Sequence, residues 1–411
     1  MELFHPKCAG LDVHKDSVVA CARSTTQGTI EREVKTFETT TRGLLALQQW
    51  LSSQGCTHVA MEATGVYWKP VWHMLEGDFE LVLANAAQVR NVPGRKSDIN
   101  DATWLADLLA HGLIRASFVP PAPIQQMRDL TRTRKQLVRE ISQHTLRIHK
   151  TLEDANLKVA SVITDMLGMT GRAILAALVA GQSDPEHLAG LAQGRLKAKH
   201  EQLVEALHGR VTDHHRFLLK LHLGLIDELD KAVDQLEARM TQVLAPMVRS
   251  AQVLSTIPGV STTAARVIIA EIGTDMSRFP SAGHLLSWAG LCPRMDESAG
   301  KRRSTRVRKG APWLKTTLVQ CAWSAARSHG TYLRAQFLRL KSRRGPKKAV
   351  LAVAASILTA AYHMLRQDVL YKDLGPDYFE RNDKERLAKR LLRRLENLGV
   401  RVVPVPTAQE A

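Results

Sequence analysis

Short apolar runs alternate with amphipathic stretches over the first hundred residues of the chain. The apolar runs have the length and the β-branched content of strands. The stretches between them repeat their apolar residues at three- and four-residue steps, as helices do. The pattern predicts strands at 8–13, 17–23, 30–36, 57–62 and 79–84, and helices at 41–52, 67–75 and 100–110.

Two long amphipathic stretches follow a proline-rich segment at 120–123, where consecutive prolines cannot continue a helix. The first predicts a helix from about Ile124 to Asn156. The second keeps alternating steps of three and four residues through seven apolar positions: Ile226, Leu229, Val233, Leu236, Met240, Val243 and Met247. This heptad seam predicts a coiled coil, antiparallel with the first helix or formed with another protomer. The alternative is an amphipathic helix lying on a globular core.

A third helical region begins near Ala251. There an apolar helix, a Pro258-Gly259 turn and a second helix at 262–272 form the pattern of a helix-hairpin-helix motif. Gly259 would let the backbone approach a phosphate closely, and the following helix would offer free N–H groups. A simple helix–helix corner is the alternative. The apolar run 349–365 contains Ser356, Thr359 and His363, which favours a buried helix over a membrane span.

The predicted fold class is therefore α/β plus all-α. Three successive strands followed by helix and strand alternation are the order of an RNase H-like domain, which we assign to 1–120. A helical coiled-coil and dimerisation region occupies 121–250, and a mainly helical C-terminal domain with the helix-hairpin-helix motif occupies 251–380. Residues 381–411 form a basic tail.

The charge of the chain is unevenly distributed. The formal net charge is +17 and the pI is about 9.9, yet residues 1–115 carry −2 and the remainder carries +19. An acid-bearing unit joined to a basic body favours a polyanionic partner such as nucleic acid. The five cysteines include no CxxC pair, which predicts reduced thiols in the cytoplasm. A zinc cluster of His5, Cys8 and His14 is a weaker alternative, because the spacing matches no usual pattern.

Four carboxylates follow the pattern of a metal-dependent nuclease. Asp12 and Glu62 each lie at the end of a strand-like run, and Asp98 and Asp101 are three residues apart on one helical face. Carboxylate oxygens hold divalent metal ions against a phosphodiester. Asp107 is six residues beyond Asp101 and points away from that face, so we expect it to be a surface acid.

A serine in a glycine-bounded loop is the second candidate for chemistry. Ser298 is followed by a dense basic cluster consisting of Lys301, Arg302, Arg303, Arg306, Arg308 and Lys309. A hydroxyl flanked by cations could attack a phosphate, because the cations stabilise the charge of the transition state. Two alternatives remain open: Ser298 only contacts a phosphate, or Ser304 within the basic run is the nucleophile.

Several of these motifs occur in the order of a known family. They are Gly10–Lys15, Glu62–Gly65, Lys96–Ala102, Ile257–Val260, Gly290–Pro293, Glu297–Lys301 and Tyr371–Phe379. Over nearly its full length the chain resembles the insertion sequence 110 family of DEDD-type transposases, recombinases associated with a bridge RNA. More narrowly it is similar to the 1111 branch.

The resemblance implies roles for the residues that match the family motifs. Asp12, Glu62, Asp98 and Asp101 would bind Mg²⁺, or Mn²⁺, in a RuvC-like domain, and Ser298 would be the nucleophile of the C-terminal transposase domain. The implied partners are donor and target double-stranded DNA, a noncoding bridge RNA and further copies of the chain in a homodimer or homotetramer. No membrane partner is expected, and the implied location is the bacterial cytoplasm, with nucleoid association when DNA is bound.

Three alternatives to a transposase stay open at this stage. A Holliday-junction resolvase-like nuclease would use the same four acids with water as the nucleophile. A DNA invertase of the Piv type would differ only in the surrounding DNA. A regulator with a degenerate nuclease fold would bind nucleic acid without cutting it.

Overall fold

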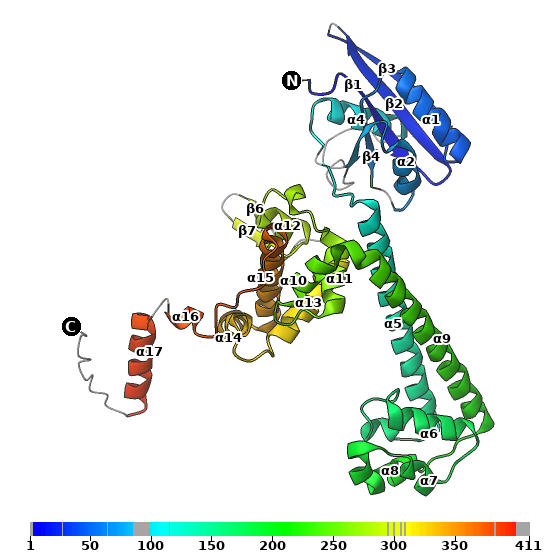
Figure 1. The fold of residues 1–411 in the computed structure, drawn as a ribbon, viewed down its shortest axis with the longest axis vertical. Coiled ribbons are helices and arrows are strands. Elements are labelled where there is room, and N and C mark those ends of the chain that lie inside the picture. Colours follow the sequence, from blue (N-terminus) through cyan, green and yellow to red (C-terminus); the bar gives the residue numbers. More distant parts are fainter. Residues whose placement is uncertain are drawn as a thin grey trace. The chain divides into compact units, whose positions relative to one another are not determined.

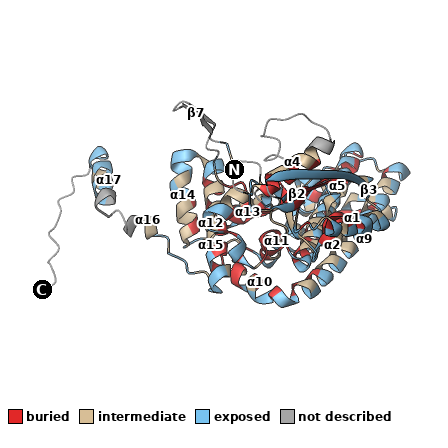
Figure 2. Cartoon of the chain, turned by 90° about the horizontal axis from the view of Figure 1, so that it is seen from above, coloured by how far each residue is buried: buried red, intermediate tan, exposed pale blue. Residues whose placement is uncertain are grey.

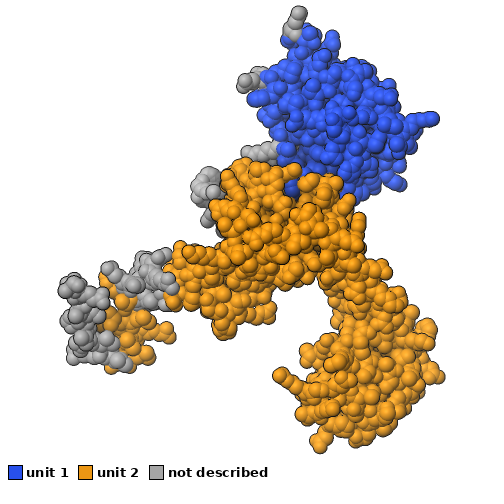
Figure 3. Space-filling view, in the orientation of Figure 1, with its two compact units in different colours: residues 1–119 blue, residues 120–411 orange. Residues whose placement is uncertain are grey.

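The computed structural model forms two compact units, residues 1–119 and residues 120–411 (Figures 1 and 3). The structure describes residues 3–26, 28–63, 65–84, 98–114, 116–293, 296–298, 301–304, 306–307, 310–381 and 384–399. Within these, the side chains of 98–100, 296–298, 301–304, 380–381, 384–387 and 390 are not described.

The first unit is built on a five-stranded sheet with the order β3-β2-β1-β4-β5. Its strands are β1 (Lys7–Val13), β2 (Ser17–Thr26), β3 (Thr29–Glu38), β4 (His58–Glu62) and β5 (Glu80–Ala84). The first three strands pair antiparallel, while β4 pairs parallel with both β1 and β5. The predicted meander followed by helix and strand alternation is confirmed, and each predicted strand agrees with an observed one to within three residues.

Helices cover both faces of this sheet. On one face, α1 (Thr41–Ser53) and α2 (Trp68–Leu75) contribute Leu47, Leu51 and Leu75 to a core shared with Leu11 and Met61. On the other face, α4 (Asp98–Ala110) lies across β1 and β2. Side chains alternate between the two faces along a strand, so each strand of the unit serves both layers.

The second unit contains an antiparallel pair of long helices, α5 (Ala122–Asp154) and α9 (Asp213–Leu244). Three contacts fix their direction, because they join residues that rise on one helix and fall on the other: Arg134–Glu237, His144–His222 and Asp154–His215. The predicted antiparallel pairing thus occurs within one chain. Supercoiling and a role in dimerisation stay predictions.

A small helical subdomain lies between these two helices in the sequence. It consists of α6 (Met169–Val179), α7 (Pro185–Gly190) and α8 (His200–Leu207). Its core includes Leu175, Leu188 and Leu203 and joins Leu152 of α5 and Ile226 of α9. The subdomain is therefore held at the end of the pair where α5 ends and α9 begins (Figure 1).

A C-terminal bundle contains α10 (Val248–Ser255), α11 (Thr262–Ile272), α12 (Ala282–Trp288), α13 (Pro312–Ala325), α14 (Tyr332–Arg344) and α15 (Pro346–Gln367). Two further helices follow it in the sequence, α16 (Tyr378–Arg381), which contacts α14, and α17 (Lys384–Asn397), which contacts α16. A hairpin of β6 (Asp296–Ser298) and β7 (Lys301–Ser304) stands between α12 and α13. The further domain boundaries near 250 and 380 stay predictions, since the structure keeps 120–411 as one unit.

Among the described residues, α15 is the one helix long and apolar enough to cross a membrane by length and composition. It packs against α10, α12, α13 and α14, and Figure 2 shows buried residues along it. Tyr362 is fully enclosed and donates a hydrogen bond to the carbonyl of Phe279 at 3.0 Å. The burial predicted for this run is confirmed in the structure.

Candidate functional site

Asp12 and Glu62 lie at neighbouring ends of adjacent parallel strands. The β1–β4 pairing runs to Leu11 opposite Met61, and the two acids are the next residues on their strands. Neighbouring strands are about 5 Å apart. Leu11 and Met61 point into the core beneath α1 and α2, so Asp12 and Glu62 project to the opposite face, the one that carries α4.

Helix α4 runs antiparallel to β1 across Gly10. The Cys8 thiol donates to the Ala106 carbonyl at 3.5 Å, and a Cβ on Gly10 would lie 2.2 Å from the Ala102 carbonyl oxygen. Positions further along β1 therefore face positions nearer the start of α4. This direction carries the helix start, where Asp98 and Asp101 lie, toward the strand end that bears Asp12.

The predicted role of Asp107 as a free surface acid is wrong. Its carboxylate accepts a hydrogen bond from Arg23 Nε at 2.9 Å and two from Arg32 Nη2 at 2.9 and 3.1 Å. The Arg23 side chain is only 2% exposed, against 24% for Asp107. The prediction failed because the sheet continues past β1 into β2 and β3, so a second face of α4 meets protein rather than solvent.

The four predicted acids stay candidates for a metal site. Among the described side chains, no group of three His, Cys, Asp or Glu is placed to hold a metal ion, and the side chain of Asp98 lies outside that set. Asp12 Oδ2 forms an ion pair with His14 Nε2 at 3.2 Å. Carboxylate oxygens are donors that Mg²⁺ and Mn²⁺ prefer, so the predicted residue types fit such an ion.

The residues of the alternative zinc cluster have other contacts. The His5 ring lies 3.8 Å from the His58 ring, and His14 contacts Asp12. Cys8 is buried beneath α4, and this burial raises the pKa of its thiol to about 12. A thiol with so high a pKa is a poor metal ligand and nucleophile, because both roles require the thiolate.

Ser298 and Ser304 occupy different places on one hairpin. Ser298 pairs with Lys301 where β6 ends, whereas Ser304 pairs with Asp296 at the other end of the two strands. The segments flanking the hairpin meet closely, because a Cβ on Gly310 would lie 2.4 Å from the Gly290 nitrogen. The backbone therefore presents Ser298 at the end of a short antiparallel ribbon anchored at its base.

The predicted basic cluster is described in part. Lys301, Arg302 and Arg303 lie on β7 beside the strand that carries Ser298. Arg306 is exposed. Arg308 and Lys309 lie outside the described residues. The register places Lys301 opposite Ser298 and Arg302 opposite Glu297.

Packing explains why residue 259 is a glycine, a reason that the sequence did not reveal. Its φ is +86°, and a Cβ there would lie 2.5 Å from both the Cys321 carbonyl oxygen and the Ala325 nitrogen of α13. The turn between α10 and α11 therefore needs glycine to pack against α13. Phosphate contact at this turn, and the helix-hairpin-helix assignment with it, stay predictions.

A basic groove that the sequence did not predict lies between α5, α11 and α13. Its volume is about 510 Å³, and its lining includes Arg134, Lys135, Arg139, Arg266 and Gly259. The cations of α5 are more than a hundred residues away from α11 in the sequence. The only available signal was the spacing of Arg132, Lys135 and Arg139, which places them along one side of a helix.

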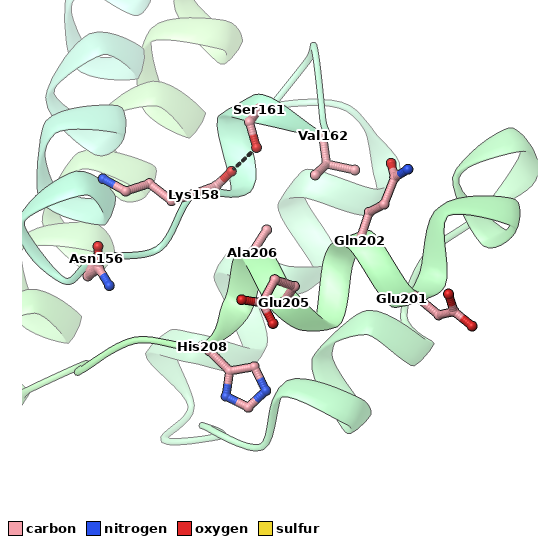
Figure 4. A pocket seen from close by; sticks show the side chains of 9 residues that line it. All are labelled: Asn156, Lys158, Ser161, Val162, Glu201, Gln202, Glu205, Ala206 and His208. Carbon is pink, nitrogen blue, oxygen red and sulfur yellow. Dashed lines mark hydrogen bonds between the residues drawn. The ribbon is translucent and has the colours of Figure 1, made fainter.

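A second hollow, of about 800 Å³, lies in the small helical subdomain (Figure 4). Its lining carries charges of both signs, including Lys158, Glu201 and Glu205. Ser161 donates a hydrogen bond to the Lys158 carbonyl at 2.7 Å. This mixed surface has neither the cluster of acids of a metal site nor the excess of cations of a phosphate site.

Comparison with known proteins matches two parts of the chain to transposase families. Residues 9–157 match a transposase model of the DEDD type of IS110. Residues 251–338 match the model "Transposase IS116/IS110/IS902 family". The chain thus carries two transposase domains of the IS110 family.

Curated relatives cover shorter stretches. An "Insertion element IS110 uncharacterized 43.6 kDa protein" of Streptomyces coelicolor is 31% identical over 131 residues, 30% of this chain and 31% of that protein. The "Pilin gene-inverting protein" of Moraxella bovis is 32% identical over 123 residues, 29% of this chain and 37% of that protein. The Moraxella lacunata protein of the same name matches to the same extent. The matched region thus spans about a third of the length of each relative.

Proposed function

We propose that this chain, with its two IS110-family transposase domains, is a DNA transposase that cuts and rejoins DNA through a serine nucleophile beside a carboxylate metal site. The observation that carries the proposal is the arrangement on the α4 face of the sheet. There the register places Asp12 beside Glu62, and the direction of α4 carries Asp98 and Asp101 toward them.

The four acids would hold one or more divalent cations, Mg²⁺ or Mn²⁺. When bound, such an ion polarises a phosphodiester and neutralises charge that develops on its oxygens. The protein's part is to fix the ligands. Close packing at Gly10 and the contacts of Asp107 with Arg23 and Arg32 hold α4 against the sheet.

Ser298 would be the attacking group. Its Oγ forms a bond to phosphorus while the bond from phosphorus to the 3′ oxygen breaks, and the proton of the hydroxyl is lost to a base. The products are a phosphoserine linkage and a free 3′-hydroxyl. Attack by a different 3′-hydroxyl reverses the step and rejoins the strand without an external energy source, because the ester is conserved. Lys301, Arg302 and Arg303 on the neighbouring strand would stabilise the charge on the phosphate.

The proposed partners of the chain are nucleic acids and further copies of itself. The +19 charge beyond residue 115 supports binding to donor and target duplex DNA, and to a noncoding bridge RNA that selects both sites by base pairing. The α5–α9 pair would serve as the strut of a homodimer or homotetramer. In such an assembly the acids of one protomer would work with the serine of another.

A site-specific invertase is the second candidate function. The printed names of the two Moraxella relatives favour it. An invertase would use the same residues and the same chemistry, so only the arrangement of the recombination sites in the DNA distinguishes the two. A resolvase would differ in its chemistry, because water rather than a serine would be the nucleophile.

Single substitutions followed by strand-cleavage assays test the chemistry. Asp12→Asn and Asp98→Asn should each lower cleavage by more than about 100-fold, because each removes a metal ligand. Asp16→Asn is the matched control, since Asp16 is an exposed acid near Asp12 and should cleave as the wild type does. Ser298→Ala should abolish cleavage, whereas Ser304→Ala should retain it.

The covalent linkage gives the decisive readout. With a 3′-end-labelled duplex trapped during reaction, label should transfer to the protein in the wild type and in Ser304→Ala, but not in Ser298→Ala, because the serine stays bonded to the 5′ phosphate of the fragment that carries the 3′ end. Cleavage that persists in a folded Ser298→Ala protein would instead indicate a resolvase with water as the nucleophile. RNA that copurifies with the protein at moderate salt should be one discrete species, and random fragments alone would contradict the guide.

A further inference from the structure

The groove between α5, α11 and α13 carries a cationic surface that the chemistry above does not use. We propose that it binds the phosphate backbone of duplex DNA, with Lys135 and Arg139 as the main contacts. The inference rests on the DNA binding proposed above and assigns it to residues other than the four acids and the serine hairpin.

The groove keeps an excess of positive charge after its internal ion pairs are formed. Glu237 accepts from Arg134 Nε at 2.8 Å and lies 3.7 Å from Arg266. Lys135 and Arg139, which also line the groove, have no ion pair among the described residues. One carboxylate is thus shared by two arginines, and two further cations remain available to an anion.

A tryptophan holds the cations together on the side of α5. The charged groups of Arg132, Lys135 and Arg139 lie 5.6, 5.5 and 5.5 Å from the centre of the Trp313 ring. Trp313 is at the start of α13, so the contacts join the helices that form the groove. Attraction between cations and the ring partly offsets their mutual repulsion and fixes them in place without neutralising them.

Burial also changes the pKa of Lys135. Partial burial and the neighbouring Arg139 lower the pKa of the Lys135 amine, while Glu271 acts in the opposite direction. An incoming phosphate would relieve the repulsion between the two cations. The energetics therefore favour an anion at this position rather than a further cation or an apolar group.

The polar lining suits a nucleic-acid backbone. Beside the cations lie Ser261, Thr263, Thr316 and Gln320, whose hydroxyl and amide groups can donate to phosphate oxygens. The ring of Trp313 is already engaged by three cations, which disfavours base stacking of the kind used for single strands. Because α11 and α13 lie within the matched transposase region 251–338, duplex DNA is the favoured occupant over duplex RNA.

Binding measured in EDTA tests this proposal independently of strand cleavage. The variant K135Q/R139Q should bind a fluorescent 40-base-pair DNA duplex at least about tenfold more weakly near 150 mM salt. The slope of log affinity against log salt should fall in magnitude by about 1.8, that is, about 0.9 for each lost phosphate contact. The charge-preserving variant K135R/R139K should restore most of the affinity and of the slope.

A matched control removes the same charge elsewhere. Lys197 and Lys199 are exposed in the small helical subdomain, and K197Q/K199Q lowers the net charge by the same amount. It should change affinity and salt slope far less than K135Q/R139Q does. Equal effects of the two double variants would overturn the proposal, because they would show that only the overall charge of the protein matters.

Lysine footprinting of the wild-type protein gives a readout that needs no variant. Bound DNA should protect Lys135 from an amine-reactive reagent while Lys197 and Lys199 stay reactive. Unchanged reactivity of Lys135 at saturating DNA would contradict the proposal. Protection by an RNA duplex of the same length, but not by DNA, would assign the groove to RNA and refute the DNA assignment. Loss of cleavage in the catalytic variants would not alter any of these outcomes.

Discussion

The α4 face of the sheet carries the candidate carboxylates, whereas the basic groove of the second unit carries cations. In both regions, groups of like charge repel one another. At the sheet, the candidate acids lie on β1, β4 and α4. At the groove, cations come together from α5 and α11. The groove carries part of its own compensation, namely Glu237, Glu271 and the Trp313 ring. On the sheet face, Asp12 has a contact with His14 at 3.2 Å.

This difference in charge explains which kind of ligand each region favours. A set of acids favours a small ion of high charge, because the ion can contact several oxygens at once. A groove whose cations are spread along helices and partly neutralised favours an extended anion that contacts them in series. Three of the predictions that follow change the charges or the packing of these two regions, and the last concerns the α5–α9 helix pair.

The largest effect should follow from removing the buried acid beneath the groove. Glu271 is nearly fully buried and receives Arg132 Nε and Nη2 at 2.9 and 3.0 Å, with Arg128 3.7 Å away. Glu271→Gln would remove the buried carboxylate that the two guanidinium groups share. We expect unfolding of the second unit to become easier by about 3 kcal/mol or more, measured by urea denaturation.

Glu237→Gln is the matched change on the exposed side of the groove. Glu237 is 38% exposed, so its loss should cost less than about 1 kcal/mol. It also removes the one carboxylate that Arg134 and Arg266 share, which should tighten DNA binding several-fold. A variant as unstable as Glu271→Gln, or one that binds DNA more weakly, would contradict this account of the groove.

The two regions also differ in how far the sequence could predict them. Strand ends and a helical spacing of three are local properties, so the positions of Asp12, Glu62, Asp98 and Asp101 on their elements could be predicted. Contacts of Asp107 with Arg23 and Arg32 span 84 and 75 residues. They depend on the width of the sheet beneath α4, which no local pattern contains.

Sequence periodicity predicts the groove even less well than it predicts the contacts of Asp107. Its cations are on helices whose apolar stripes the sequence does show, but the stripes do not say that α11 packs on α5 or that Trp313 approaches Lys135. Gly259 illustrates the same limit. Its turn was predictable, whereas its contact with α13 depends on a helix that starts more than fifty residues later.

A second large effect is expected from the contact that holds α4 on the sheet. Asp107→Asn removes the charge that compensates Arg23, whose side chain is 2% exposed. We expect a loss of about 2–3 kcal/mol in the unfolding free energy of the first unit. Mg²⁺ affinity, measured by calorimetry, should fall as well, because α4 carries two of the proposed ligands.

Arg23→Met distinguishes this account from a general sensitivity of the sheet. The substitution replaces a buried cation with an apolar side chain of similar length, and Asp107 keeps Arg32 as its partner. The loss of stability should therefore be clearly smaller than for Asp107→Asn. Equal losses would show that side-chain packing, rather than the buried charge, holds α4 in place.

A somewhat smaller effect should follow from crowding the same helix. A Cβ on Gly10 would meet backbone atoms of Ala102 and Ala106 at 2.2 and 2.5 Å, so Gly10→Ala must shift α4. We expect a cost of about 2 kcal/mol together with weaker Mg²⁺ binding. Gly224→Ala is the control, because nothing lies within 4 Å of a Cβ there. It should stabilise α9 by about 0.5–1 kcal/mol, and a stabilising Gly10→Ala would refute the close approach.

The smallest effect concerns a like-charge contact in the antiparallel helix pair. Nδ1 of His144 on α5 lies 3.2 Å from Nδ1 of His222 on α9. Burial, then His144, then Arg147 lower the pKa of His222, so the folded state favours its neutral form. Above the unfolded pKa near 6.5 the histidine is neutral in both states, and the folded protein keeps its full stability. As the pH falls from there toward the folded pKa, the unfolded state binds the proton more readily, and stability is lost. In His222→Gln, Tm should therefore fall less between pH 7.5 and 5.5 than in the wild type. Identical Tm changes would show that the histidine contact does not destabilise the pair in acid.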